Sequence, residues 1–252
     1  MKAKKGPRTY GQSGRNDKEN YVRKMFDAIA PTYDLMNLVI TLGLWRYWQR
    51  RFLSRLALTG SEKILDVGSG TAELALLMGE VITSGRIVGV DLSREMLRIG
   101  REKIRARGLE GVIDLRLGNA VRLEFDDGEF DVVTSGFVLR NVADLPCALK
   151  EMARVTRPGG RVVCMELTWP ENLWLKWPYF FYFYWIVPVL GWLAEKGSGK
   201  GAYTYLPHSL KTFPPAPRLA EMFREAGLTR VSYQKISGGI VAIHTGFKPE
   251  AP

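Results

Sequence analysis

A glycine-rich turn and a later acidic residue are the side chains in this chain best suited to hold a ligand. Gly68 and Gly70 follow the apolar run Lys63–Val67, and a backbone without Cβ atoms can turn sharply and approach a ligand closely. The unpaired N–H groups of the following helix would face that ligand. About twenty residues on, Asp91 ends a second apolar run, where a carboxylate can accept hydrogen bonds from a ribose diol. This pair indicates a nucleotide-containing cofactor.

The spacing of the turn distinguishes between cofactors. A dinucleotide site favours Gly-x-Gly-x-x-Gly, whereas this turn runs from Asp66 through Gly68 and Gly70 to Ala72. The pattern resembles the first motif of class I S-adenosylmethionine-dependent methyltransferases. That cofactor has no pyrophosphate, so the glycines would make room for its amino-acid part. We therefore expect S-adenosyl-L-methionine and not a nicotinamide.

Alternating apolar and amphipathic segments predict the sheet that positions the turn. Such alternation requires right-handed crossovers and a parallel sheet, and Ser93 is a good N-cap for the helix after Asp91. The sequence Arg157–Gly160 predicts a turn before the fifth strand. The expected strands are 63–67, 86–91, 112–117, 130–134, 161–166, 229–235 and 239–247, and the expected helices are 72–81, 93–107, 144–155 and 216–226.

The last two strands should form an antiparallel hairpin, because only the tight turn Ser237–Gly239 separates them. The predicted fold is therefore α/β, with a seven-stranded, mostly parallel, Rossmann-like sheet that contains one antiparallel strand. Residues 17–57 look helical, with Pro31 ending the first helix and an amphipathic segment from Leu44 to Leu56. These helices precede the first strand, so we expect them to lie over the mouth of the cofactor cleft.

A dense aromatic block interrupts the alternation after the fifth strand. Between Asn172 and Leu193, ten of the twenty-two residues are Trp, Tyr or Phe. A membrane-spanning helix is opposed by Lys176, Pro178 and Pro188 and by an apolar run shorter than about 20 residues. Because Tyr and Trp favour membrane interfaces, we expect a lipophilic pocket or an interfacial helix, and an ordinary buried helix is the alternative.

The composition of the chain limits which class of protein it can be and which compartment we expect it to occupy. The chain has 252 residues, of which 46% are hydrophobic and 25% charged, as in a folded globular protein. Its net charge is +10, and residues 1–24 contain eight Lys or Arg but two acidic residues. Such a tail either settles on an anionic surface or only aids solubility. Cys147 and Cys164 offer no disulfide framework or metal-ligand spacing, so we expect a reducing compartment and no metal. Residues 1–24 hold no apolar core segment, so we expect no secretory signal.

Several longer segments resemble one family, the menaquinone/ubiquinone biosynthesis C-methyltransferases, also called UbiE-like. The resemblance covers roughly residues 20–249, which is nearly everything outside the basic tail. It implies a flexible tail over 1–20 and one methyltransferase domain over 21–252, with a helical cap at 21–60 and a substrate-side aromatic insertion at 167–212. The segments that carry it are 25–37, 137–142, 154–161, 202–209 and 238–249.

The resemblance implies a role for particular residues. The turn and Thr71 would contact the cofactor, Asp91 would hold its ribose, and Asn119 would lie at the adenine unless it merely caps a turn. The general base stays open among Tyr33, Asp34, Arg140, Asn141, Tyr203, Tyr205, His208 and His244, and His244 has the alternative of a structural hydrogen bond. In its charged form Arg140 cannot act as a base, but it could stabilise a developing phenolate. The expected cofactor-binding residues are Asp66, Gly68, Gly70, Thr71, Asp91, Leu92, Asn119 and Ala120, and the expected catalytic residues are Tyr33, Arg140, Asn141 and His244.

The chain also departs from the family pattern near the acceptor side. Ala72-Glu73 stands where the family usually has Gly-Asp, and Trp45 replaces a common His. Gly136 and Val138 replace a usual Ser and Gly around Phe137. A methyl group at position 72 tightens the turn, whereas Glu73 keeps the acid one carbon longer.

The implied reaction transfers a methyl group from S-adenosylmethionine to a ring carbon of a prenylated quinol, most simply demethylmenaquinol or a ubiquinol precursor. We expect a cytoplasmic protein that associates peripherally with the inner face of the cell membrane through the aromatic insertion and the basic tail. Nucleic acid is not expected, because the aromatics are not interleaved with basic residues. Whether the chain forms a homodimer stays open. The alternatives are methylation of another lipid, such as a phospholipid amine, and a membrane-associated binding protein that has lost catalysis.

Overall fold

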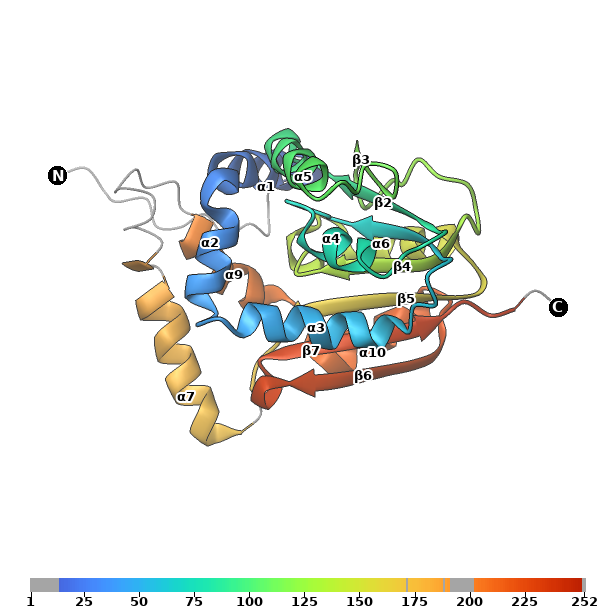
Figure 1. Cartoon of the computed structure of the whole chain (residues 1–252). Helices are drawn as coiled ribbons and strands as arrows, with labels where there is room; N and C mark the ends of the chain where they lie inside the picture. The colour runs from blue at the N-terminus through green and yellow to red at the C-terminus, as the bar shows by residue number, and fades with distance from the viewer. Residues whose placement is uncertain (1–13, 171, 188, 191–201, 251–252) are drawn as a thin grey trace.

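A single seven-stranded sheet forms the centre of the molecule, whose computed structural model describes residues 14–170, 172–187, 189–190 and 202–250. In chain order the strands are β1 (Lys63–Val67), β2 (Arg86–Asp91), β3 (Ile113–Leu117), β4 (Phe130–Gly136), β5 (Thr156–Leu167), β6 (Thr229–Ile236) and β7 (Val241–Phe247). Their order across the sheet is β3-β2-β1-β4-β5-β7-β6 (Figure 1). The strand β7 runs antiparallel to both of its neighbours, and the other described pairs are parallel. The predicted mostly parallel sheet with one reversed strand is confirmed.

Side chains that alternate along the strands divide the core into two layers. The flanking helices are α3 (Leu44–Leu56), α4 (Glu73–Gly79), α5 (Arg94–Ala106), α6 (Leu145–Val155) and α10 (Ala216–Glu225). Ile64 packs with side chains of α3, α4 and α5, whereas its neighbour Leu65 packs with α6 and α10. Cys164 is fully buried in the second layer. Both faces of the sheet are therefore covered, which explains why the central strands are almost continuously apolar.

The carboxyl ends of β1, β2 and β4 meet at one edge of the sheet. Val67 pairs with Val90 of β2, and Asp66 pairs with Thr134 of β4. After β1 the chain adds β2 and β3 on one side and then crosses to β4 on the other. Ligands of open α/β sheets bind at such a reversal of strand order. The fold therefore directs the glycine turn after β1 into the expected crevice.

The N-terminal helices lie across this edge of the sheet. They are α1 (Arg15–Ile29), a 3₁₀ turn (Ala30–Thr32) that contains Pro31, and α2 (Tyr33–Ile40). Pro31 therefore follows the end of the first helix, as predicted. Met25 and Ile29 of α1 share a buried cluster with Met96 of α5 and with Tyr205, which lies on α9 (Ala202–Thr212). Figure 1 shows α1, α2 and α9 gathered at this end of the molecule.

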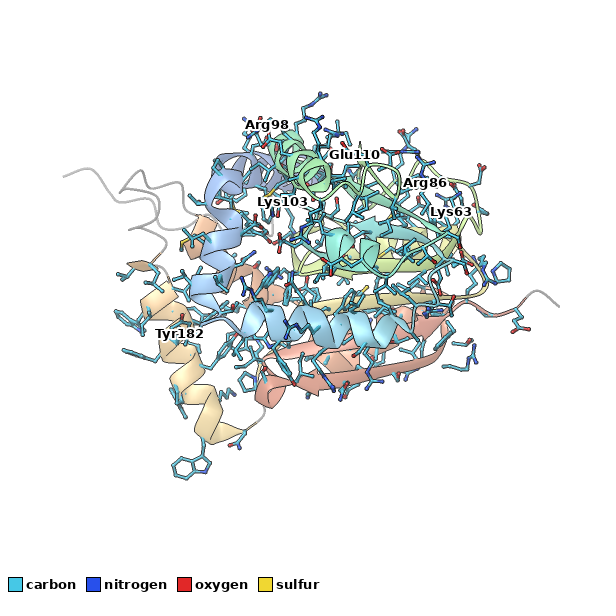
Figure 2. The ribbon with its side chains drawn as sticks, in the orientation of Figure 1. Lys63, Arg86, Arg98, Lys103, Glu110 and Tyr182 are labelled. Carbon is cyan, nitrogen blue, oxygen red and sulfur yellow. The ribbon has the colours of Figure 1, made fainter. Side chains whose placement is uncertain are left out.

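The aromatic insertion forms a helix beside α2. The helix α7 (Leu173–Phe181) continues into a π-helical turn (Tyr182–Ile186). The hydroxyl of Tyr182 donates to the backbone carbonyl of Ile40 at 2.9 Å, and Tyr182 is labelled at this junction in Figure 2. Within the described residues, no helix is long and apolar enough to cross a bilayer. Residues 1–13, 171, 188, 191–201 and 251–252, which include Trp192 and most of the basic tail, lie outside the described part of the chain.

One predicted boundary needs correction. The strand β5 begins at Thr156 instead of residue 161, so the predicted turn Arg157–Gly160 lies inside it. The pairing shifts there, because Phe130 of β4 pairs with Thr156 whereas Val132 pairs with Arg161. Gly159 takes φ = +73°, and its N–H donates to the carbonyl of Lys248. The predicted turn residues thus form a bulge in β5, and the hydrogen bond to Lys248, just after β7, holds that bulge in place.

Candidate active site

The turn after β1 is built from two glycines in the left-handed region. Gly68 has φ = +73° and Gly70 has φ = +54°, conformations that cost a residue with a side chain free energy. A Cβ on Gly68 would lie 2.3 Å from a methyl carbon of Val138. The N–H groups of Gly68 and Ser69 donate to the carbonyl of Val90 at 2.7 and 3.0 Å. The turn is therefore fixed between β2 and the loop after β4.

Asp91 connects this turn to the next helix. Its carboxylate accepts hydrogen bonds from the N–H of Gly70 at 2.9 Å and the N–H of Ser93 at 2.8 Å. Burial raises the pKa of Asp91, although these two N–H groups favour its charged form. A carboxylate offers about four lone-pair positions, so two remain for hydroxyl groups of a ligand. Ser93 caps α5 by accepting from the N–H of Met96, as predicted.

Asp66 presents an unpartnered buried oxygen at the same edge. Its Oδ1 accepts from the hydroxyl of Thr134 at 2.8 Å, whereas Oδ2 is buried and has no hydrogen-bond partner among the described residues. Burial raises the pKa of Asp66 to about 7, and the nearby charge of Asp91 adds to the effect. A buried carboxylate without a partner is costly. The arrangement therefore suits a ligand that brings a positive charge or a hydrogen-bond donor.

These groups line one cleft of about 1030 Å³, part of it open to solvent, which we call the turn cleft. Asn119 stands on its wall, and its side-chain oxygen accepts from the N–H of Val121 at 3.1 Å. The amide therefore caps a turn and still has an NH₂ group for a ligand. Helix α1 contributes Val22 and Phe26, so the N-terminal helices do lie over the cleft. The expected cofactor-binding residues all line it: Asp66, Gly68, Gly70, Thr71, Asp91, Leu92, Asn119 and Ala120.

A second cavity of about 830 Å³, which we call the aromatic cavity, adjoins the turn cleft. Its walls include Tyr179, Tyr182 and Phe183 of the aromatic insertion and Ile29 of α1. The two spaces share a partition, because five residues line both of them: Phe26, Tyr33, Trp45, Phe137 and Asn141. A ligand in one space would thus lie next to a ligand in the other.

Phe137 forms the centre of this partition in a strained conformation. Its φ is +60°, which is uncommon for a bulky residue and is typical of functional sites. Its N–H donates to the carbonyl of Met165 at 2.8 Å, and its ring lies 5.0 Å from that of Trp45 and 6.0 Å from that of Trp48. These contacts hold the ring where the two cavities meet. Trp45 therefore gives the partition an aromatic surface beside Phe137.

Polar groups beside the partition come from the start of α2 and from the 3₁₀ turn Leu139–Asn141. Tyr33 begins α2, and burial raises the pKa of its phenol although the nearby Arg140 opposes the rise. Tyr33 is therefore neutral at pH 7 and able to donate a hydrogen bond. Arg140 lines the aromatic cavity, and its Nη1 donates to Glu166 at 2.7 Å with both side chains buried. Burial lowers the pKa of Arg140, but the charge and the hydrogen bond of Glu166, together with the nearby Tyr33 and Tyr205, keep it above its usual value.

A charged network ties the glycine turn to α2. The hydroxyl of Thr71 donates to Asp34 at 2.6 Å, and Lys103 of α5 donates to Asp34 and, at 2.7 Å, to Glu73. Figure 2 shows Lys103 pointing from α5 toward the turn side of the sheet edge. Glu73, which replaces a family Asp, therefore has a partner that suits its extra carbon. Asp34 is occupied by two donors, which makes it a poor general base in this arrangement.

Comparison with known proteins matches this chain to one family. The ubiE/COQ5 methyltransferase family matches residues 15–248. The chain belongs to this family. It is 40% identical over 243 residues to the demethylmenaquinone methyltransferase of Symbiobacterium thermophilum, covering 95% of this chain and 97% of that one. It is 41% identical over 232 residues to the protein of the same name from Geobacillus kaustophilus, covering 92% and 98%. The resemblance noted in the sequence is confirmed.

Solved structures agree on the fold. The [4+2]-cyclase SpnF matches with a TM-score of 0.67 at 19% identity, over 91% of this chain and 96% of that chain. A SAM-dependent methyltransferase from Aquifex aeolicus matches with a TM-score of 0.57 at 15% identity, over 79% and 88%. At these identities the likeness concerns the fold alone. It supports the class I methyltransferase architecture of this member of the ubiE/COQ5 family.

Three of the four expected catalytic residues meet at the partition, and His244 does not. Tyr33 and Asn141 line both cavities and Arg140 lines the second. His244 is buried in β7, where its Nε2 lies 2.9 Å from the carbonyl oxygen of Ala216. Burial lowers its pKa to about 4, so it is neutral at pH 7. It lines neither cavity, and its position fits the structural alternative. The side chain of Tyr203 lies outside the described part of the chain.

Sequence reasoning missed two groups, Lys103 and Glu166. Lys103 meets Asp34 across 69 positions of sequence, and no local pattern in the helix indicates this contact. Glu166 did carry a signal, because it is an acid near the end of the buried strand β5, as Asp91 is at the end of β2. Acids at the carboxyl ends of parallel strands lie at the ligand-binding edge. The same rule that selected Asp91 would have selected Glu166.

Proposed function

We propose that this protein is an S-adenosylmethionine-dependent C-methyltransferase that converts a prenylated demethylquinol, most simply demethylmenaquinol, to its methylated product. The observation that carries the proposal is the pair of adjoining cavities with a shared partition. One is polar at the glycine turn and the other is lined by aromatic and aliphatic side chains. A reaction between a nucleoside cofactor and an oily ring needs such a pair. The relatives named demethylmenaquinone methyltransferase, at about 40% identity, support the same assignment.

The turn cleft has the residues that S-adenosylmethionine requires. When bound, this cofactor supplies an electrophilic methyl group on a sulfonium. Asp91 would accept hydrogen bonds from the ribose hydroxyls through its remaining lone pairs, and the free NH₂ of Asn119 would donate to the adenine. The unpartnered Oδ2 of Asp66 would accept from the cationic amino group. The glycine turn leaves room for the amino-acid part.

The aromatic cavity would hold the quinol ring and the first part of its prenyl chain. Deprotonation of the ring hydroxyl, directly or through water, makes the neighbouring carbon nucleophilic. Arg140 would stabilise the negative charge that develops on the oxygen, and neutral Tyr33 would orient the ring by a hydrogen bond. The apolar walls exclude water and fix the distance between the reacting atoms. The chain thus contributes positioning and electrostatics.

A methyl-transfer assay tests the proposal. Purified protein is given S-adenosylmethionine labelled in its methyl group, with demethylmenaquinol and a demethylated ubiquinol precursor in parallel reactions. We expect the labelled methyl group on a ring carbon of the quinol, and faster transfer to demethylmenaquinol than to the ubiquinol precursor. Label that runs with phospholipid head groups from a lipid extract would contradict the proposal. So would cofactor binding by calorimetry without transfer to either quinol.

The exposed face of α7 supports peripheral association with the cytoplasmic side of the cell membrane, where such a substrate resides. Trp174, Trp177 and Trp185 are 90%, 72% and 67% exposed, and Trp favours the lipid interface. Lys176 on the same helix and the basic residues of 1–24 would favour anionic lipid. We expect co-sedimentation with vesicles containing phosphatidylglycerol. The double substitution Trp174→Ser and Trp177→Ser should reduce it, whereas Tyr47→Ser, an exposed aromatic on α3, serves as the control. Equal sedimentation of all three proteins would contradict the association.

A further inference from the structure

A buried ion pair lies beside the aromatic cavity. Arg140 belongs to the 3₁₀ turn Leu139–Asn141, and its Nη1 donates to Oε2 of Glu166 at 2.7 Å. The two side chains are 6% and 2% exposed. The N–H of Leu167 donates to the same oxygen at 3.2 Å. Glu166 is therefore fixed within the sheet, whereas Arg140 stands on a loop and meets Glu166 through its guanidinium.

Stability does not account for this pair. Taking two charges out of water costs several kcal/mol per ion. Replacing a buried ion pair by apolar side chains of similar volume often leaves the stability of a protein unchanged or increases it. Moreover, each partner keeps one buried atom without a hydrogen-bond partner among the described residues, namely Nε of Arg140 and Oε1 of Glu166. Buried polar atoms are normally satisfied. Within the described part of the chain these enclosed atoms bring no compensating hydrogen bond, so the cost of the pair points to a role at the cavity that Arg140 lines.

The electrostatics of the site add a second reason for the pair. The proposed cofactor carries a positive charge in the turn cleft, and Arg140 adds a second cation at the neighbouring cavity. In a poorly solvated site two such charges repel strongly. The carboxylate of Glu166 compensates the guanidinium without lining either cavity. Its ionisation is favoured by Arg140, which opposes the rise in pKa that burial causes.

We propose that Glu166 is the positioning residue for Arg140 in methyl transfer. It holds the guanidinium at the wall of the aromatic cavity, where Arg140 would donate to the ring oxygen of the quinol, and it compensates the charge of Arg140 opposite the cationic cofactor. This inference rests on the proposed function and assigns a role to a residue outside both cavities. Glu166 touches no substrate and acts through Arg140.

The test uses Glu166→Gln, which keeps shape and removes charge, and Glu166→Asp, which keeps charge and shortens the side chain. Turnover of demethylmenaquinol is measured between about pH 6 and 9, alongside cofactor affinity by calorimetry. For Glu166→Gln we expect kcat to fall about 100-fold, as on loss of one oriented donor to an oxyanion. The pH–rate profile should move toward higher pH, because a displaced cation no longer favours the ionised ring oxygen. Glu166→Asp should restore part of kcat.

The double variant Arg140→Lys with Glu166→Gln separates coupling from independent damage. Residues that act as a unit are non-additive, so the second substitution should cost much less than it does alone. Glu166→Gln with the wild-type kcat and pH profile would overturn the inference, as would full additivity in the double variant. If Glu166→Gln does not fold, Glu166→Asp decides, and wild-type kcat and pH profile in that variant overturn the inference. A wild-type protein without quinol methylation would instead refute the proposed function itself.

Discussion

The turn cleft and the aromatic cavity are built in different ways. The polar wall of the cleft is made by residues close in sequence at the ends of β1 and β2, and the backbone N–H groups of its turn are fixed by Val90 and Asp91. The aromatic cavity collects side chains from α1, α2, α3, α7, α9 and the loop after β4. The shape of the turn cleft therefore depends on backbone geometry and charge, whereas the shape of the aromatic cavity depends on how side chains from several helices pack. This difference predicts that substitutions in one cavity affect cofactor affinity, whereas substitutions in the other affect turnover.

Arg140→Ala should give the largest effect on the aromatic side. The substitution removes the donor at the cavity wall and leaves Glu166 as a buried charge without its cation. We expect kcat to fall by 100-fold or more, on the order of 10²–10³ for loss of one charge-stabilising donor, while cofactor affinity persists. Steady-state kinetics and calorimetry on the same preparation check this. Unchanged turnover would remove Arg140 from the mechanism.

Asp91→Ala should have the opposite effect, lowering cofactor affinity while leaving turnover almost unchanged. It removes the expected ribose acceptor and the partner of the N–H groups of Gly70 and Ser93. Loss of hydrogen bonds to a charged group costs about 1.5–3 kcal/mol, so we expect cofactor affinity to fall roughly 10- to 100-fold. At saturating cofactor, kcat should change little. Asp91→Asn, which retains one acceptor oxygen, is the matched control and should lose less affinity. Equal loss in both variants would argue against the ribose contact.

The titration of Asp66 should make cofactor binding pH-dependent. Its pKa is raised from 3.8 to about 7, so the folded protein holds this proton more tightly than the unfolded chain does. The stability that this proton contributes is present below about pH 4 and is lost as pH rises toward 7. Ionisation over the same range should strengthen binding of the cationic cofactor, by about tenfold per pH unit at most. Calorimetry from pH 5 to 7 checks the affinity, and Asp66→Asn should flatten the dependence. An equally steep dependence in that variant would contradict the assignment.

Ala72→Gly should have the smallest effect. Ala72 caps α4 with φ = +66°, which costs about 1–2 kcal/mol for a residue with a Cβ. Glycine removes that strain but adds about 0.4–1 kcal/mol of unfolded-state entropy. We expect the free energy of unfolding to rise by about 1 kcal/mol or less, with cofactor affinity unchanged. Ala75→Gly, in the interior of the same helix, should lower it by about 1 kcal/mol. Chemical denaturation distinguishes the two variants.

The difference between the two cavities also explains which site residues could be predicted from the sequence. The glycine turn and Asp91 were readable because their chemistry depends on spacing within one β–α–β unit, and the structure gathers all the expected cofactor residues in one cleft. Tyr33 and Arg140 were found through the family resemblance, since nothing local joins a residue of α2 to one after β4. Lys103 was missed because its partner Asp34 lies 69 positions away in sequence, whereas Glu166 carried the same strand-end signal as Asp91 and was overlooked. His244 follows the family pattern, but it lies in β7 with its side chain at the start of α10, away from both cavities.

Tyr33, Phe137 and Asn141 border both chambers. A substitution among these three residues that makes room for a bulkier acceptor therefore also reshapes the seat of the methyl donor. Engineers who wish to broaden the range of rings this enzyme accepts should select for donor retention and acceptor size together whenever they change this junction.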